Sequence, residues 1–359
     1  MAGTDDMKGG RIPPGTVVIP VAEAVGTVLC HDITRIVPGE CKGRAFKKGH
    51  VVTAADIPTL LQLGKEHLYV WTPQPGIVHE NEAAIRLAAA ARGENLALGE
   101  PAEGKINFTA ACQGLLRINV PLLERINRLG RIAFATRHGL REVAAGEAVA
   151  GVRVIPLMVE EELIARAERL CAAENEPVVS VLPFRRFRVG MIITGSEVFH
   201  GRISDGFGPV LRRKFGALGS EIMGQRLTAD DLELTRDAIT AFVADGADMV
   251  VLTGGMSVDP DDRTPAAIRA SGARVVSYGA PMFPGAMFLL SYLDGKNGPV
   301  PVLGLPGCVM YHRASIFDIV VPRLLAGVEV TVDDLAGLGH GGFCASCPEC
   351  RYPCCPFGI

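Results

Sequence analysis

Residues 189–197 read VGMIITGSE, and residues 248–257 read DMVVLTGGMS. Each stretch starts with a continuous apolar run of strand length and ends in glycine and hydroxyl residues. Such runs are typical of strands buried on both faces of a parallel sheet. Around them the pattern predicts helices at 208–218 and 311–325. Two further helices are expected, one capped by Asp230 or Asp231 and one with Thr264 as its N-cap. Strands are expected at 221–224, 274–277 and 300–304. Strands that alternate with helices predict a doubly wound α/β domain with a mainly parallel sheet over residues 186–327.

The rest of the chain divides into three sections. Residues 1–78 form a β-rich section and residues 79–182 a mixed α/β section of unknown role, and both are expected to fold as smaller domains. Residues 335–359 are a Gly-rich linker followed by a cysteine-rich tail. In these sections we expect strands at 16–21, 26–33, 67–71, 106–108 and 131–136, and helices at 54–63, 81–92 and 158–173.

The composition argues against several classes of function. The chain has 359 residues, 48% hydrophobic and 21% charged, and its formal net charge is −3. This balance gives no electrostatic footprint for nucleic acid or a membrane surface. No run of about 18 apolar residues predicts a membrane span, and residues 1–14 lack the apolar core of a signal peptide. We therefore expect a cytoplasmic protein with a small-molecule substrate and neither a nucleic-acid nor a membrane partner.

Three loops leave the carboxyl ends of the predicted parallel strands, where ligands bind in open α/β sheets. They cover residues 194–205, 253–264 and 305–308. In the second loop, Gly254-Gly255 lets backbone N–H groups approach an oxyanion closely, because glycine has no Cβ. The hydroxyls of Thr253 and Ser257 and the helix that opens at Thr264 add further donors. These features predict a site for a phosphate or a similar anion.

Acidic residues in the same loop point to a cation. Asp259, Asp261 and Asp262 lie within four positions, and three carboxylates would repel a phosphate unless a divalent cation intervened. Mg²⁺ is commonly held by one or two carboxylates together with substrate phosphate. The alternative is that these acids cap the N-terminus of the following helix. Asp262 suits the metal role best, and for Asp259 and Asp261 the two interpretations are equally supported.

Five motifs, in this order, resemble the molybdopterin-binding domain of molybdenum-cofactor biosynthesis. They are Ile193-Thr-Gly-Ser-Glu197, Ile203-Ser-Asp205, Leu252-Thr-Gly-Gly-Met-Ser257, Asp262-Arg-Thr-Pro265 and Leu305-Pro-Gly307. The resemblance implies a site for molybdopterin or its adenylylated form with Mg²⁺. By that resemblance Asp205 and Asp262 match functional acidic positions. The expected ligand-binding residues are Thr194, Gly195, Ser196, Glu197, Thr253, Gly254, Gly255, Ser257, Thr264, Pro306 and Gly307.

The N-terminal section resembles the molybdopterin molybdenumtransferase branch of this family, which includes gephyrin-like proteins. The resemblance rests on residues 21–32 and 46–50, with Asp56-Ile57 and Leu63-Gly64. In this branch the reaction places molybdate on the dithiolene of adenylylated molybdopterin and releases AMP. The chain departs from the branch at two places: Pro284-Gly-Ala-Met287 stands where the family has Pro-Gly-Lys-Pro, and Pro306-Gly-Cys-Val309 where it has Pro-Gly-Asn-Pro. Ala286 cannot replace the charge of that lysine.

Two other functions remain open. One is a carrier or sensor that holds molybdopterin without catalysis, which the missing lysine and the cysteine tail favour. The other is a nucleotide pyrophosphatase or amidohydrolase, because the competence-damage family has a related domain. For any of the three we expect a homo-oligomer, and molybdoenzymes or other proteins of the cofactor pathway are the expected protein partners.

The tail carries cluster-type cysteine spacing. Cys344-x₂-Cys347-x₂-Cys350-x₃-Cys354 is followed directly by Cys355-Pro356. Such spacing predicts metal binding through Cys344, Cys347, Cys350 and Cys354, either as a four-thiolate zinc site or as an iron–sulfur cluster. The alternative is a tail with free thiols. This alternative is disfavoured because so many free thiols would be prone to oxidation.

Overall fold

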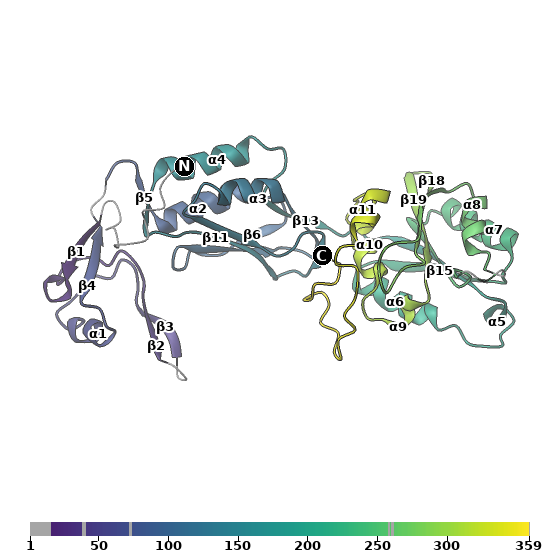
Figure 1. Cartoon of the computed structure of the whole chain (residues 1–359), viewed down its shortest axis with the longest axis horizontal. Coiled ribbons are helices and arrows are strands. Elements are labelled where there is room, and N and C mark those ends of the chain that lie inside the picture. Colours follow the sequence, from purple (N-terminus) through teal and green to yellow (C-terminus); the bar gives the residue numbers. More distant parts are fainter. Residues whose placement is uncertain (1–15, 38–40, 72–73, 258, 260–261, 359) are drawn as a thin grey trace. The chain divides into compact units, whose positions relative to one another are not determined.

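The computed structural model describes residues 16–37, 41–71, 74–257, 259 and 262–358. The chain forms two compact units (Figure 1). The first runs to Ala111 and includes Ile118–Arg137 and Ala145–Ser180, whereas the second comprises Cys112–Arg117, His138–Ala144 and the chain from Val181 onward. Within the described ranges, no helix is both long and apolar enough to cross a membrane.

The N-terminal part of the first unit consists of two antiparallel strand pairs and short helices. Strand β1 pairs with β4, and β2 pairs with β3. Burial of Leu29, Leu60 and Leu68 builds a small core between them. The elements are β1 Thr16–Pro20, a 3-10 helix Val21–Glu23, β2 Ile33–Val37, β3 Cys41–Phe46, α1 Ile57–Gln62 and β4 His67–Trp71.

The remainder of the first unit is a sheet with helices. The four-stranded sheet has the order β6-β7-β11-β9, with α2 packed against β7 and β11. Stacked Phe108 and Phe134, with ring centroids 5.4 Å apart, lie in its core. The elements are β5 Ile77–His79, α2 Glu80–Ala91, β6 Leu96–Leu98, β7 Lys105–Ala110, α3 Val120–Asn127, β9 Ile132–Thr136, β11 Ala148–Val154, β12 Met158–Glu160 and α4 Glu161–Ala172.

The second unit is built on a six-stranded sheet with the order β15-β14-β16-β19-β18-β17. Strands β15, β14, β16 and β19 are parallel, and β18 runs antiparallel to β19 and β17. This arrangement confirms the predicted α/β class with a mainly parallel sheet. The strands are β14 Arg188–Thr194, β15 Glu221–Thr228, β16 Met249–Thr253, β17 Arg274–Tyr278, β18 Leu289–Gly295 and β19 Gly298–Leu305.

Helices pack on both faces of this sheet. Met191 and Ile193 of β14 share one core with Phe215 of α6, whereas Ile192 faces the opposite core with Phe242 of α7. The alternation follows from the two-residue period of a strand, and it makes both faces of β14 apolar. The helices are α5 Ser196–Phe199, α6 Phe207–Ala217, α7 Leu232–Ala244, α8 Thr264–Ala270, α9 Cys308–Tyr311, α10 Ile316–Leu325 and α11 Val332–Gly337.

Several elements predicted for the first unit, and one strand of the second unit, differ from the structure. Residues 26–33 were expected to be a strand, but isolated bridges at Val28 and Leu29 occur there, and strand β2 starts only at Ile33. The helix expected at 158–173 begins at Glu161, because Met158 and Val159 pair with β5 instead. The strand β18 was not expected at all.

Other corrections concern helix boundaries. Residues 195–197 do not form only a loop, since α5 starts at Ser196. Thr264 is the first residue of α8, and Arg263 occupies the N-cap. The final helix was expected from Tyr311 but starts at Ile316, where Ser315 and Asp318 form a capping box that fixes the start of α10.

The C-terminal segment packs onto the second unit together with three strands from earlier in the chain. These strands, β8 Gly114–Ile118, β10 Arg141–Val143 and β13 Val179–Pro183, form a sheet of order β10-β8-β13. Phe357 is buried in the core of the unit, and the Tyr352 hydroxyl donates a 2.8 Å hydrogen bond to the Asp318 carbonyl. Arg141 donates to the carbonyl of Phe357 and lies 5.4 Å from the Tyr352 ring centroid. The tail is therefore anchored at Tyr352 and at Phe357.

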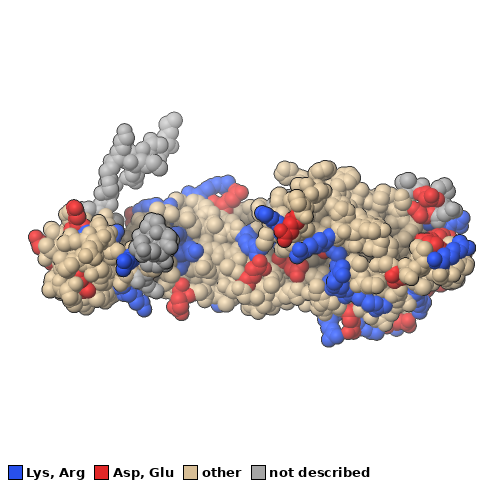
Figure 2. All heavy atoms as spheres, turned by 90° about the horizontal axis from the view of Figure 1, so that it is seen from below, with Lys and Arg blue, Asp and Glu red and all other residues tan. Residues whose placement is uncertain are grey.

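The surface carries charges of both signs. On the face shown in Figure 2, lysine and arginine are interspersed with aspartate and glutamate, and uncharged residues lie between them. The charge on this face is therefore mixed, with no field of a single sign extending across it.

A buried histidine joins the two parts of the first unit. His79 Nε2 lies 2.6 Å from the carbonyl oxygen of Cys30, so this nitrogen carries the proton and donates. His79 Nδ1 then accepts from Lys48 Nζ at 2.8 Å and from the Asn81 backbone N–H at 3.1 Å. Burial, together with the nearby Lys48 charge, lowers the pKa of His79 from 6.5 to about 4. The imidazole is therefore neutral at neutral pH.

This histidine predicts a pH-dependent stability. The unfolded chain binds a proton at His79 below about pH 6.5, whereas the folded chain resists it down to about pH 4. Stability is therefore lost as the pH falls through this window, at up to about 1.4 kcal/mol per pH unit. Burial raises the pKa of Glu80, which acts in the opposite sense. We therefore expect chemical denaturation of wild type and His79→Gln between these pH values to differ in slope, with the variant flatter. Parallel slopes would contradict this role.

Candidate functional site

A cavity of about 310 Å³ lies at the carboxyl ends of β16 and β19. The loops after both strands contribute to its wall, which is where the parallel sheet predicts a ligand site. Six of the residues expected to bind ligand or metal line it: Gly254, Gly255, Ser257, Asp262, Pro306 and Gly307.

Gly254 and Gly255 have a structural reason to be glycine. Their φ angles are +85° and +55°, a region that residues with a side chain rarely adopt. A Cβ on Gly254 would collide with the carbonyl oxygen of Thr194, and one on Gly255 would stand 2.8 Å from Thr264 Oγ1. The sequence interpretation had placed a ligand where these Cβ atoms would stand. The structure places the protein itself there, so the loops after β14 and β16 meet too closely for a side chain.

Three threonines hold this junction together. Thr194 Oγ1 lies 3.2 Å from the Thr253 carbonyl and 3.0 Å from Thr264 Oγ1. Thr264 Oγ1 also donates to the Gly254 carbonyl at 2.9 Å. All three side chains are buried, and the Thr253 hydroxyl has no hydrogen-bond partner among the described residues. Thr194 and Thr264 thus bind protein atoms rather than the cavity, and contact of any of the three with a ligand stays a prediction.

The first loop directs its polar groups toward Asp230. The backbone N–H and the hydroxyl of Ser196 both donate to Asp230 Oδ2 at 2.9 Å. Gly195 has a φ of 141°, and Glu197 is exposed. None of these three predicted ligand residues lines the cavity, and their role in binding remains a prediction.

Asp205 is engaged within the protein. Its Oδ1 accepts the backbone N–H of Phe207 at 2.8 Å and of Gly208 at 3.0 Å. Its Oδ2 accepts Gln225 Nε2 at 2.8 Å. The carboxylate thereby satisfies orphan donors at the start of α6 and links this helix to β15. Asp205 does not line the cavity, and its predicted catalytic role stays untested.

Asp262 faces the cavity and organises the second loop. Its Oδ2 accepts the Ser257 backbone N–H at 2.7 Å, which closes the loop across the residues between them. The Asp259 carbonyl accepts the Asp262 N–H at 2.9 Å, and the Asp259 side chain is exposed. Asp261, the third acid of the predicted metal set, lies outside the described residues. Asp262 is therefore the described acid of this set that is in position to meet a ligand.

Other side chains complete the site without having been expected. Phe207, Met256 and Met287 supply apolar wall. The Tyr278 hydroxyl donates to the Met256 carbonyl at 3.1 Å and so supports the second loop from β17. Burial and the charge of Asp262 raise the pKa of Tyr278, which keeps the hydroxyl protonated as a donor. Sequence could have pointed to Met287, since it lies in the Pro-Gly-Ala-Met run that departs from the resembled family.

The tail cysteines are not gathered into a ligand set. Cys344, Cys350 and Cys355 are partly buried against the core of the second unit, whereas Cys347 and Cys354 are exposed. Among the residues that the structure describes, no three His, Cys, Asp or Glu side chains are placed to hold a metal ion. The tail as folded here does not fit zinc or a cluster, so metal binding at these thiols stays a prediction.

Two glycines of the cavity should differ in how a side chain at their position affects stability. Gly254→Ala should destabilise the second unit by at least about 1–2 kcal/mol, because the positive φ and the collision with Thr194 both oppose a side chain. Gly307→Ala is the matched control, since a Cβ there meets nothing within 4 Å. Urea denaturation should separate the two variants. Equal urea midpoints would show that the loops after β14 and β16 can move apart to accommodate a side chain at Gly254.

Comparisons with known proteins find a match over the residues that form this cavity. Residues 190–326 match the family model described as "Probable molybdopterin binding domain", and residues 18–72 match a domain of unknown function. A molybdopterin molybdenumtransferase of Staphylococcus aureus is 30% identical over 115 residues, 30% of this chain and 27% of that protein. A CinA-like protein of a Mycobacterium species is 32% identical over 81 residues, 23% of this chain and 19% of that protein. The chain therefore spans about a quarter or less of the length of these relatives.

Some solved structures resemble a part of this chain. MoaB of Pyrococcus furiosus, described as a tungsten cofactor synthesizing protein, is 21% identical over 40% of this chain and 98% of its own, with a TM-score of 0.34. The molybdopterin biosynthesis enzyme MoaB of Thermus thermophilus is 19% identical over 39% of this chain and 97% of its own, with a TM-score of 0.31. Residues 190–326 are thus similar to the probable molybdopterin binding domain and, in part, to molybdopterin molybdenumtransferases.

Proposed function

We propose that this protein inserts molybdate into adenylylated molybdopterin with release of AMP, using the cavity at the ends of β16 and β19. The observation that carries the proposal is the convergence of Gly254, Gly255, Ser257, Asp262 and Gly307 on one cavity within the matched domain. Backbone donors in a glycine-rich loop suit a phosphate, and the apolar wall suits the planar pterin.

The loop after β16 would hold the anionic part of the ligand. Gly254 and Gly255 adopt positive φ in succession, and such successive turns of backbone N–H groups form anion-binding concavities. The buried threonine junction beneath them fixes the loop, so that few groups must be ordered when ligand binds. The chain's own contribution would be a preformed phosphate cradle.

Asp262 would hold Mg²⁺ against the ligand phosphates. Its Oδ2 is bound to the Ser257 N–H, while its other oxygen has no hydrogen bond to the described residues. Mg²⁺ is typically bound through one or two carboxylates, with waters and substrate phosphate completing the shell. The donor set therefore fits a cation shared with the ligand. The ion would neutralise phosphate charge next to Asp262.

A carrier without catalysis is the second candidate, and Ala286 favours it. The resembled transferases have a lysine at this position, and alanine offers no charge to an oxyanion such as molybdate. The carrier and the transferase would bind the same ligand in the same cavity. They differ in whether molybdate causes AMP to be released.

Gly307→Val should separate ligand binding from folding. A Cβ at this position meets no protein atom within 4 Å, yet the residue lines the cavity. We expect it to weaken binding of adenylylated molybdopterin by about five- to 150-fold, which corresponds to a steric cost of about 1–3 kcal/mol. The urea midpoint should not change. Calorimetry measures the binding, and AMP release on adding molybdate measures turnover. Tight binding by wild type without AMP release selects the carrier, and no binding refutes both candidates.

Asp262→Asn should reveal the metal. Asparagine keeps an oxygen for the Ser257 N–H but removes the charge, so folding should persist. We expect the Mg²⁺ concentration for half-maximal ligand binding to rise by about tenfold or more, the effect of losing one charge-assisted interaction. Asp237→Asn, an exposed acid on α7, is the control. A Mg²⁺ requirement unchanged by Asp262→Asn would remove this residue from the site.

A further inference from the structure

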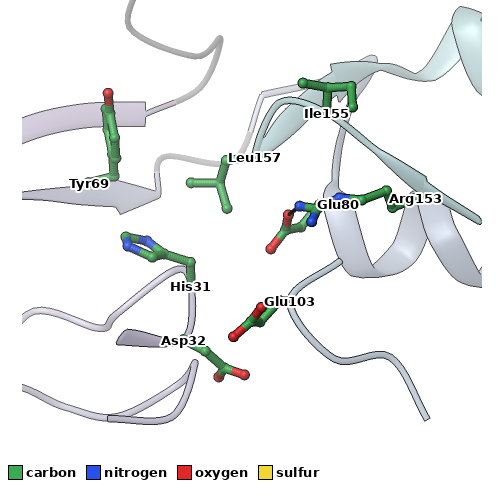
Figure 3. Close-up of a pocket in the computed structure, with 8 residues that line it drawn as sticks. All are labelled: His31, Asp32, Tyr69, Glu80, Glu103, Arg153, Ile155 and Leu157. Carbon is green, nitrogen blue, oxygen red and sulfur yellow. Dashed lines mark ion pairs between the residues drawn. The ribbon is translucent and has the colours of Figure 1, made fainter. Parts of the chain in front are cut away.

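A second cavity lies in the first unit, outside the matched molybdopterin-binding domain. It measures about 310 Å³ and is lined by side chains from the N-terminal strands and from the sheet that follows them. Figure 3 shows the carboxylates of Asp32, Glu80 and Glu103 around this space, with Arg153 extending toward Glu80. Nothing in the proposed reaction uses these residues.

Glu80 is a buried acid that forms an ion pair with Arg153 but has no hydrogen-bond donor among the described residues. The residue is only 7% exposed and begins α2. Its carboxylate accepts no hydrogen bond from any described residue, and the guanidinium of Arg153 stays 3.6 Å away, beyond hydrogen-bond distance. Burying a charged group without hydrogen bonds is costly, so such a group is a sign of a missing partner. Gly104, where a Cβ would collide with this carboxylate, leaves the room that Glu80 occupies.

The charges around Glu80 determine the sign of that partner. Three carboxylates and one guanidinium line the cavity. His31, which also lines it, has its pKa lowered by burial and by Lys65 and so adds no charge at neutral pH. The nearby ammonium of Lys48, which donates to His79 at 2.8 Å, adds a second positive charge, so that three carboxylates face two cations. The lining therefore has an excess of negative charge and favours a cation.

The arrangement suits an organic cation better than a metal ion. Asp32, Glu80 and Glu103 are all described, yet no three acidic, histidine or cysteine side chains among the described residues converge enough to hold a metal. On the other side of the cavity, Leu157 and Tyr69 supply apolar and aromatic surface. A flat apolar body could lie on this wall while a charged head reaches Glu80.

We propose that this cavity is a second ligand site, which binds a small organic cation of the amidinium or amine class through Glu80 and Glu103. The planar N–H groups of an amidinium can meet a carboxylate in a paired arrangement, as guanidinium does. Glu103, whose Oε1 accepts the Thr34 hydroxyl at 2.9 Å, keeps its other oxygen available at the cavity rim. The site is independent of the molybdopterin cavity.

Benzamidine is the probe ligand. Benzoate, which has a similar shape but the opposite charge, is the control ligand. Binding to the full-length protein is measured by ligand-observed NMR titration at neutral pH. We expect benzamidine to bind and benzoate not to bind. Glu80→Gln should weaken benzamidine by about tenfold to a hundredfold, as expected for one charge-assisted hydrogen bond. Glu82→Gln, exposed on the same helix two residues further on, should leave binding unchanged.

Glu103→Gln keeps the test decisive if Glu80→Gln does not fold, because Glu103 is exposed and its replacement leaves the core intact. We expect a smaller loss, of about threefold to tenfold, for this partly solvated charge. Equal benzamidine affinity in wild type and whichever of these variants fold would overturn the proposal. So would benzoate binding as tightly as benzamidine, or equal weakening by Glu82→Gln.

Discussion

The close approach of two loops at the carboxyl edge of the sheet is the constraint on which the second unit's site depends. Strands β14 and β16 are parallel neighbours in the sheet, so the loops that follow them start side by side. Gly254 lies against the Thr194 carbonyl with no space for a side chain. The buried threonine hydroxyls then close the junction with hydrogen bonds that water cannot replace. The position of the cavity follows from this contact.

The two cavities proposed to bind ligands would meet the problem of ligand charge in opposite ways. In the second unit, glycine backbone forms part of the wall, and its N–H groups carry partial positive charge and cost no side-chain entropy to order. In the first unit the wall carries full negative charges on side chains, and burial of Glu80 makes that charge expensive until a partner arrives. The site in the second unit would be preorganised by its backbone N–H groups. The site in the first unit contains a buried carboxylate, Glu80, that accepts no hydrogen bond from the described residues.

Local pattern accounts for what the sequence could predict. The runs at β14 and β16 are apolar on both faces, so their strands and the glycine loop after β16 could be located from residues alone. The hairpin of β18 and β19 was missed although Asp294-Gly295 and Asn297-Gly298 are turn signals. The pairing of Thr194 with Thr264 could not be seen, because it joins loops that are 70 residues apart. Glu80 was equally hidden, since an acid at the start of a helix ordinarily serves the helix dipole in water.

The chain passes between the two units five times, at residues 111–112, 117–118, 137–138, 144–145 and 180–181. This connectivity limits how the protein can be dissected. A recombinant fragment of residues 186–327 would contain the whole six-stranded sheet but would lack β8, β10 and Phe357. Arg323 of α10 and the apolar face that Tyr352 and Phe357 cover in the whole chain would then meet solvent or other molecules, and such a fragment would tend to aggregate. Expression of the ligand-binding domain alone therefore requires the early strands and the C-terminal segment to be carried along, or the exposed apolar side chains to be replaced.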